Sequence, residues 1–89
     1  MDQDRKAERI LEARAVLCGQ GLRAIREKRG LSLREAVCGT TLDHAHLSRV
    51  ECGERGASVL TLGYIARIYR YKSTEALLDV AESLQRKRL

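Results

Sequence analysis

GLSLREAVCGTTLDHAHLSRVECG, residues 30–53, is the stretch that decides the fold. Ser32 followed three residues later by Glu35 is the pattern of a capping box, in which each side chain bonds the other residue's backbone N–H. A helix is therefore predicted to begin near Leu33. Gly30 lies just before it, where a preceding helix would end on a residue able to adopt positive φ.

The second half of this stretch predicts another helix. Residues 39–41, Gly-Thr-Thr, continue a helix poorly, so the helix that begins near residue 33 must be short. Asp43 is of a type that caps helices, and it precedes a segment from His44 to about Cys52 that the following glycine ends. Leu47 and Val50 are expected to point toward the core from this segment, because they lie three residues apart.

The residues before this stretch predict one or two helices. Residues 2–17, DQDRKAERILEARAVL, are dense in helix formers and carry acidic side chains at the end that the helix dipole favours. Their apolar stripe continues through Leu11, Cys18, Leu22 and Ile25. Gly19 and Gly21 each cost a helix about 1 kcal/mol relative to Ala, so a break near residues 18–21 is as compatible with the sequence as a continuous helix to Arg29.

Two further helices are predicted after the loop GERGAS. Ser58 can cap a helix from Val59 to about Arg70, and Ser73 or Thr74 can cap another from residue 75 to about residue 85. The basic residues 86–89 are expected to be frayed. The positions predicted to face inward are Leu62, Ile65, Ala66, Tyr69, Leu77, Leu78, Ala81 and Leu84.

Composition supports the same fold class. The chain of 89 residues has room for one small domain with a thin core. Pro, Trp and Phe are absent, and abundant Leu, Ala, Arg and Glu favour helix. No period-two run of Val, Ile and aromatic residues predicts a strand. We therefore expect an all-α chain.

Charge and cysteine content narrow the function classes. Lys and Arg number 17 against 12 Asp and Glu, which gives a net charge of +5, typical of small nucleic-acid-binding domains. An acidic groove or a membrane surface would also fit this charge. No apolar run approaches the roughly 18 to 20 residues of a membrane span, and no signal-peptide core follows the charged N-terminus, so we expect a cytoplasmic protein that binds no membrane. Three cysteines without close pairing suit reduced thiols.

The order of helices and linking residues carries a family resemblance. The residues concerned are Leu22–Arg26, Gly30–Ser32, Leu47–Glu51, Gly53, Ser58, Thr61–Leu62, Ile65–Ala66 and Glu75–Leu77, which cover residues 18–78. In this order the chain resembles the Cro and phage-repressor helix-turn-helix proteins, often called XRE-like. The resemblance implies a five-helix repressor-like domain at residues 18–80, an N-terminal helical extension at residues 1–17, and the end of the last helix with a basic tail at residues 81–89.

The resemblance implies a transcriptional regulator that binds double-stranded DNA. The helix His44–Cys52 would lie in the major groove, which is wide enough to admit one α-helix. The residues matching the family's base-reading positions are His44, Ala45, Ser48 and Arg49. Arg49 has the most specific chemistry, because a guanidinium can donate two hydrogen bonds to guanine.

The resemblance also assigns phosphate contacts and one structural ion pair. The phosphate contacts fall on Ser32, Leu33, Arg34 and Arg55. Backbone N–H groups at a helix N-terminus suit an anion, and arginine adds a charge-assisted bond. Glu51 would be repelled by phosphates, and in the family the matching glutamate pairs with the arginine that corresponds to Arg26.

Besides DNA, the sequence suggests two kinds of binding partner, a second copy of the chain and a different protein. A single short helix reads few bases, so we expect a homodimer, formed through the last helix with Leu84 and Leu89 or through the N-terminal helix with Ile10 and Leu11. Several family positions differ here, among them Leu33, residues 40–41, Ala45, Cys52 and Glu54. These differences favour an alternative, a module that binds a protein such as a toxin, a sigma factor or another regulator.

Metal binding and catalysis are less compatible with the pattern. Cys38, His44, His46 and Cys52 are zinc-type ligands, but they lack close cysteine pairs. The two histidines are two residues apart and would point about 200° apart on a helix. No glycine-rich nucleophile turn accompanies the cysteines, and spacing gives a thiol redox sensor no support. We expect no cofactor, no metal and no enzymatic activity.

Overall fold

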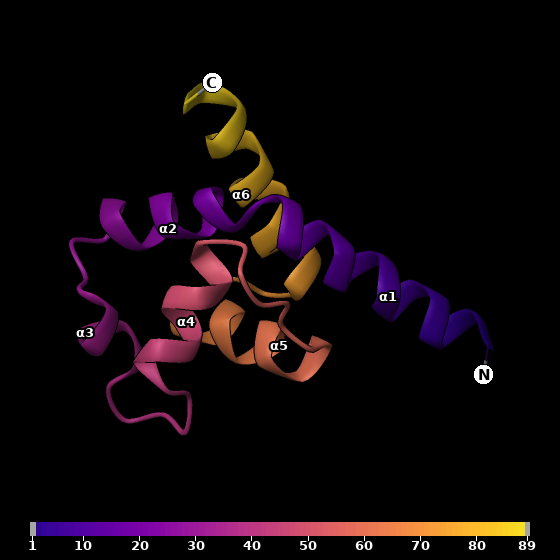
Figure 1. The fold of residues 1–89 in the computed structure, drawn as a ribbon, viewed down its shortest axis with the longest axis horizontal. Coiled ribbons are helices and arrows are strands. Elements are labelled where there is room, and N and C mark those ends of the chain that lie inside the picture. Colours follow the sequence, from indigo (N-terminus) through magenta and orange to yellow (C-terminus); the bar gives the residue numbers. More distant parts are fainter. Residues whose placement is uncertain (1, 89) are drawn as a thin grey trace.

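The computed structural model describes the backbone of residues 2–88 and the side chains of residues 5–87, and within that range all regular structure is helical, which confirms the all-α prediction (Figure 1). The six helices are α1 (Asp2–Leu17), α2 (Gly19–Lys28), α3 (Leu33–Val37), α4 (His44–Glu51), α5 (Val59–Ile68) and α6 (Thr74–Arg88). Helix α6 crosses α2, and α4 and α5 pack below this crossing. Helix α1 extends away from the other helices toward the N-terminus (Figure 1).

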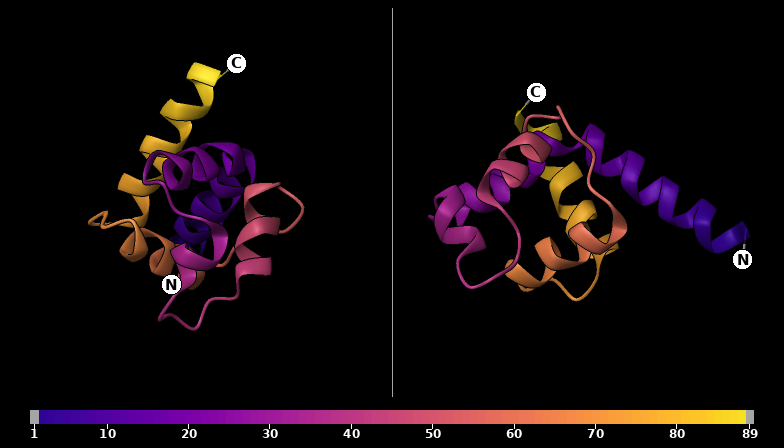
Figure 2. Two further views of the ribbon diagram at one scale, coloured as in Figure 1. Left: turned by 90° about the vertical axis from the view of Figure 1, so that its left-hand side faces the viewer. Right: turned by 60° about the horizontal axis from the view of Figure 1, so that its bottom comes forward.

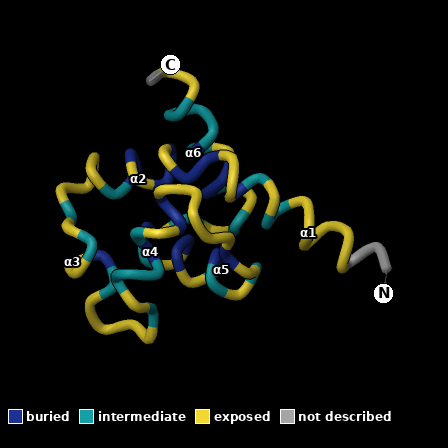
Figure 3. The backbone as a smooth tube through the Cα atoms, viewed as in Figure 1, coloured by how far each residue is buried: buried dark blue, intermediate teal, exposed yellow. Residues whose placement is uncertain are grey.

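The core lies where α2, α4, α5 and α6 meet, as the buried positions in Figure 3 indicate. Its largest fully buried side chains are Tyr69, Leu22, Leu47, Leu62, Ile65, Leu77, Leu78, Val50 and Cys18. Most inward-facing positions predicted from helical spacing are among the buried residues, and Leu84 is half-buried against the cluster. The apolar periodicity of the sequence therefore predicted the core faces correctly.

The helix is interrupted at Cys18, between α1 and α2. The structure therefore has a break near residues 18–21 and not one continuous helix to Arg29. The glycines after the break allow close backbone contacts. A Cβ on Gly19 would lie 2.6 Å from the Val50 carbonyl oxygen, and one on Gly21 would lie 1.9 Å from the Ala81 carbonyl oxygen. Neither position can hold a side chain without moving a neighbouring helix.

Gln85 of α6 holds the break together. Its Nε2 donates a hydrogen bond to the Leu17 carbonyl oxygen at 2.6 Å, and its Oε1 accepts one from the Gly21 N–H at 3.1 Å. These are backbone groups at the end of one helix and the start of the next, which often lack partners inside their own helices. One side chain from the far end of the sequence thus satisfies both.

The second half of α1 packs on α5 and α6. Ala15 is fully buried, and the Glu12 carboxylate accepts a hydrogen bond of 2.9 Å from the Val59 N–H at the start of α5. Arg14 donates to Asp79 at 2.8 Å and also to Glu82. By contrast, residues 5–10 are exposed.

Serine residues cap three helices as the sequence predicted. Ser32 and Glu35 form the reciprocal capping box of α3, Ser58 accepts from the Thr61 N–H, and Ser73 rather than Thr74 accepts from the Ala76 N–H. Each bond satisfies an N–H that has no acceptor within its helix.

Three details differ from the predictions. Asp43 stands at the N-cap of α4, but its side chain makes no cap hydrogen bond. Helix α5 ends at Ile68, because Arg70 adopts a left-handed φ of 62° that ends the helix. Residues 86–88, predicted to be frayed, continue α6; Leu89 lies outside the described residues.

Candidate nucleic-acid interface

The inner face of α4 is fixed to the core. Leu47 and Val50 are each 1% exposed and belong to the central cluster. The C-terminal end of α4 also lies against the start of α2, where Gly19 leaves room for the carbonyl groups of Val50 and Glu51. The position of α4 is therefore determined by packing on two sides.

A buried ion pair joins α4 to α2. Arg26 Nε donates to Glu51 Oε2 at 2.8 Å, and its Nη2 donates to Oε1 at 2.9 Å. The two side chains are only 11% and 3% exposed. The bond to Glu51 raises the pKa of Arg26. The ion pair predicted between these residues is therefore present, in the bidentate form that is strongest for arginine.

The same guanidinium also reaches the segment before α3. Arg26 Nη1 donates to the Leu31 carbonyl oxygen at 2.8 Å. One side chain thereby connects α2, the loop that leads into α3, and α4. Its removal would leave a carboxylate and a carbonyl group without their partner.

The outer face of α4 carries the four candidate base-reading residues. His44, Ala45 and Ser48 are half-buried, and Arg49 is exposed. Arg49 makes no ion pair with the described side chains of residues 5–87. Its side chain is thus available to a ligand. His44 Nδ1 lies 3.4 Å from the Asp43 carboxylate, which places an acidic group at the start of α4.

Of the candidate phosphate-binding residues at α3, Ser32 is already hydrogen-bonded within the capping box, whereas the N–H groups of Leu33 and Arg34 are free to bind a ligand. The Ser32 hydroxyl accepts from the Glu35 N–H at 3.1 Å, and the Ser32 N–H donates to the Glu35 carboxylate at 2.9 Å. These bonds lower the pKa of Glu35, so its negative charge remains beside the start of α3. The N–H groups of Leu33 and Arg34 have no acceptor within the helix, because they lie in its first turn.

The loop after α4 brings the remaining phosphate candidate near the end of that helix. The N–H groups of Glu54 and Arg55 both donate to the Arg49 carbonyl oxygen, at 3.0 and 3.3 Å. The Arg34 and Arg55 side chains are exposed and form no ion pair within the described chain. Together with Arg49 they provide three arginines on the α3, α4 and following-loop segments.

The connection between α3 and α4 is longer than that of a typical helix-turn-helix. The helices lie side by side (Figure 2), and residues 38–43 join them, whereas the usual turn has about three or four residues. Gly39 has a φ of 78°, and Thr40 Oγ1 donates to the Val37 carbonyl oxygen at 2.7 Å while accepting from the Leu42 N–H. Thr40 thus ends α3 and stabilises the loop.

The cysteines and histidines do not gather into a metal site. Among the side chains described, those of residues 5–87, no group of three or more His, Cys, Asp or Glu is placed to hold a metal ion. Cys38 and Cys52 are exposed, whereas Cys18 is buried, which raises the pKa of its thiol to about 11. His46 has a buried Nε2 without a hydrogen-bond partner.

Two acidic neighbours of the candidate contacts were not among the residues predicted for the site. Glu35 could have been recognised as one, since a capping box necessarily places its carboxylate at the start of α3. Asp43 could not have been recognised in this way, because its residue type predicts a helix cap, whereas its carboxylate lies beside His44. Both carboxylates lower the positive potential of this surface.

None of the helices among residues 2–88 is long and apolar enough to cross a membrane. Comparison with family models, curated proteins and solved structures found no match to this chain.

Proposed function

We propose that this chain is a sequence-specific double-stranded DNA-binding regulator of the Cro and phage-repressor type, with α4 as its recognition helix. The observation that carries the proposal is the contrast between the two faces of α4. Leu47, Val50 and Glu51 hold the helix to the rest of the domain, while Arg49 is exposed and forms no ion pair with the side chains of residues 5–87. A helix held rigidly from behind can present side chains to base edges in the major groove.

Charge supports this proposal. The net charge of +5 suits a polyanionic ligand. Arg34 and Arg55 are exposed, and with Arg49 they could neutralise several phosphates around one helix. The N–H groups of Leu33 and Arg34 add neutral donors for a phosphate oxygen, and the Glu35 carboxylate opposes them.

The proposed DNA-bound form is a homodimer, because one α4 covers few base pairs and two copies can read half-sites about one helical turn apart. Ile10 on α1 is 54% exposed, whereas Leu11 is half-buried against the core. Leu84 on α6 is also half-buried. If the dimer forms through α1, Ile10 is therefore the residue that would provide the apolar contact.

The proposal is tested by fluorescence anisotropy with duplex DNA from upstream of the chain's own gene, measured over a series of salt concentrations. Specific binding should weaken steeply with salt, because each phosphate contact releases a counterion. Affinity that is independent of salt, or no binding at low salt, would contradict the proposal.

A second candidate function is a protein-interaction module with DNA binding secondary or lost. The long connection at residues 38–43 and the carboxylates of Glu35 and Asp43 favour it, because both features differ from what a DNA-facing helix pair needs. A toxin, a sigma factor or another regulator would then be the ligand. Absence of DNA binding together with capture of one partner protein would select this candidate.

A further inference from the structure

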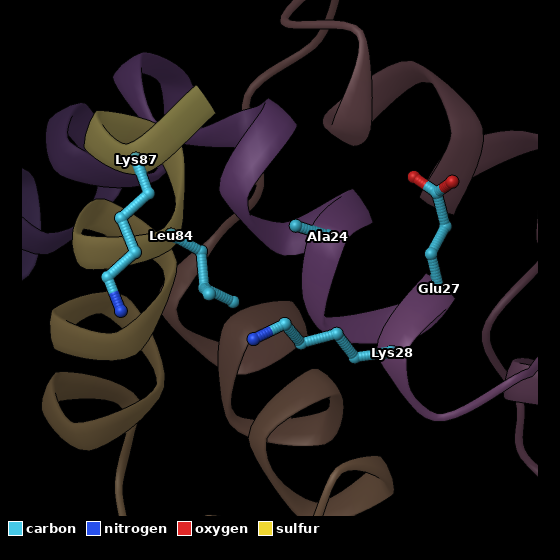
Figure 4. A pocket seen from close by; sticks show the side chains of 5 residues that line it. All are labelled: Ala24, Glu27, Lys28, Leu84 and Lys87. Atoms are coloured by element: carbon cyan, nitrogen blue, oxygen red, sulfur yellow. The ribbon is translucent and has the colours of Figure 1, made fainter. Parts of the chain in front are cut away.

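A groove lies between α2 and α6, away from the α3 and α4 surface. The two helices make close backbone contact at Gly21 and Ala81, and one cavity of about 330 Å³ is lined by Ala24, Glu27, Lys28, Leu84 and Lys87 (Figure 4). A second cavity of about 280 Å³ shares Lys28 and Leu84 with the first. The two cavities therefore lie next to each other along the helix crossing, and together they are called the groove here.

The floor of this groove is apolar. Ala24 and Ile25 contribute from α2, and Val80 and Leu84 contribute from α6. Val80 and Leu84 are only half-buried, although both pack on the core cluster. A ligand with apolar side chains would bury the remainder of these two residues.

The rim of the groove is basic. Lys28 and Lys87 extend along the cavity beside Leu84, whereas the Glu27 carboxylate points away from both (Figure 4). Neither lysine makes an ion pair with another side chain of residues 5–87. Arg29 lies beside the second cavity, with its guanidinium carbon 5.4 Å from the centre of the Tyr71 ring.

The nearby carboxylates of α6 are held on the side of α1. Arg14 binds Asp79 and Glu82. Glu27 is 3.2 Å from Arg23 on its own helix. Asp79 and Glu82 are thus held on the side of α1, and the lining of the first cavity contains two lysines and one carboxylate, that of Glu27.

We propose that this groove binds an acidic amphipathic helix of a partner protein, which assigns Leu84 to the partner and leaves the dimer contact to Ile10 on α1. Apolar side chains at helical spacing would cover Val80 and Leu84, and carboxylates on the flanks would meet Lys28 and Lys87. Helix-in-groove recognition uses anchors of this spacing. Nucleic acid fits less well, because its phosphates would satisfy the lysines but would leave the apolar floor uncovered.

The test uses a fluorescein-labelled synthetic peptide of about 15 residues, with leucines at helical spacing and glutamates on both flanks. Its binding to the full chain is measured by anisotropy, and amide NMR signals locate the contact. We expect the peptide to bind and to shift the signals of Ala24, Lys28 and Leu84. The double variant Lys28→Glu/Lys87→Glu should weaken binding about tenfold, because two attractions become repulsions.

Three controls keep the result interpretable. Lys6→Glu, at an exposed position on the part of α1 that extends away from the other helices (Figure 1), should leave peptide affinity within about twofold, since an exposed charge far from the contact has a small effect. A scrambled peptide of equal composition should bind weakly, which separates apolar recognition from plain charge attraction. Arg49→Ala should not change peptide binding, so a failure of the DNA proposal would remain distinguishable.

Several outcomes would overturn the inference. They are equal binding of the scrambled peptide, unchanged affinity in the double lysine variant, NMR shifts confined to α3 and α4, or no binding at about millimolar peptide. Circular dichroism melting of each variant verifies that the exposed substitutions leave the fold intact.

Discussion

Helices α4 and α1 are each attached to the same body through an arginine and its carboxylate partners, but the two attachments differ in burial. The Arg26 and Glu51 side chains at α4 are 11% and 3% exposed. At α1, Arg14 is 26% exposed, and its partner Asp79 is 71% exposed. Breaking a buried pair typically costs about 3–5 kcal/mol, whereas an exposed pair contributes about 0–1 kcal/mol. The comparison indicates that α4 is locked in place and that α1 is held more weakly.

This difference agrees with the proposed role of α4. A helix that reads base edges must hold its side chains at defined positions, and α4 is fixed by its buried face, by Arg26 and by the close contact at Gly19. Residues 5–10 of α1 are exposed, so this part of α1 contributes little to the core. The following predictions test the contrast, beginning with the largest effect.

Glu51→Ala should reduce the free energy of unfolding by about 3–5 kcal/mol, because it leaves the Arg26 charge buried without its carboxylate. Urea denaturation measures the change. Glu54→Ala, at an exposed position just beyond α4, is the matched control and should change stability by less than about 0.5 kcal/mol.

Replacing both partners sharpens the same prediction. The double variant Arg26→Met/Glu51→Leu should recover most of the loss, since apolar side chains of similar size can replace a buried pair at little cost. The Leu31 carbonyl oxygen would still lose its bond from Arg26. If Glu51→Ala reduces the free energy of unfolding by less than about 1 kcal/mol, the Arg26–Glu51 pair stabilises the protein no more than an exposed ion pair does.

Gly19→Ala should destabilise the protein by about 1–3 kcal/mol, because the added Cβ meets the Val50 and Glu51 carbonyl oxygens at 2.6 and 2.7 Å. The substitution pushes α4 away from α2, so DNA affinity should fall with stability. Gly63→Ala is the control, since a Cβ there meets nothing within 4 Å. Equal stability of the two variants would argue against the close contact.

Tyr69→Phe should stabilise the protein by about 1 kcal/mol at neutral pH, because the buried Tyr69 hydroxyl has no hydrogen-bond partner. Burial, with a smaller contribution from the Glu51 charge, raises the pKa of Tyr69 from 10.0 to about 12. The unfolded chain therefore loses this proton first, and stability that is present below pH 10 is lost as the pH rises toward 12.

Thermal melting between pH 7 and pH 12 measures this alkaline loss. The wild type should also lose stability as the pH rises from 9 to 11, since burial raises the pKa of Cys18 from 9.0 to about 11. Tyr69→Phe should show a smaller decline than the wild type above pH 10. Identical pH profiles would mean that Tyr69 is not buried as described.

Arg14→Ala should have the smallest effect, a loss of less than about 1 kcal/mol, because its carboxylate partners are partly exposed. Added salt should reduce the difference between variant and wild type. Urea denaturation at low and high salt checks both statements. A loss as large as that of Glu51→Ala would remove the contrast between the two attachments.

Local features of the fold were predictable from the sequence. The serine caps at Ser32 and Ser58 involve residues within three positions of each other, so a short pattern contains the whole interaction. The buried faces of α5 and α6 follow from the period of an amphipathic helix. The partnership of Arg26 and Glu51 came from family resemblance, since the two residues are far apart in the sequence.

Features that depend on distant contacts could not be predicted. The break after α1 is stabilised by Gln85, and the need for glycine at position 21 comes from the Ala81 backbone. Neither partner is visible in the local sequence around residues 18–21. Asp43 is of a residue type that caps helices, yet its side chain makes no cap hydrogen bond. Residue type alone does not predict this, because a cap bond also depends on how the preceding loop orients the side chain.

The central claim, that the outer face of α4 reads DNA sequence, is tested most directly by Arg49→Ala. A duplex selected from a random library and a shuffled duplex are compared by anisotropy at one salt concentration. The wild type should prefer the selected duplex, and Arg49→Ala should lose about 1–3 kcal/mol of that preference, while Lys72→Ala keeps it. Equal wild-type affinity for both duplexes, or an unchanged preference in Arg49→Ala, would contradict the claim.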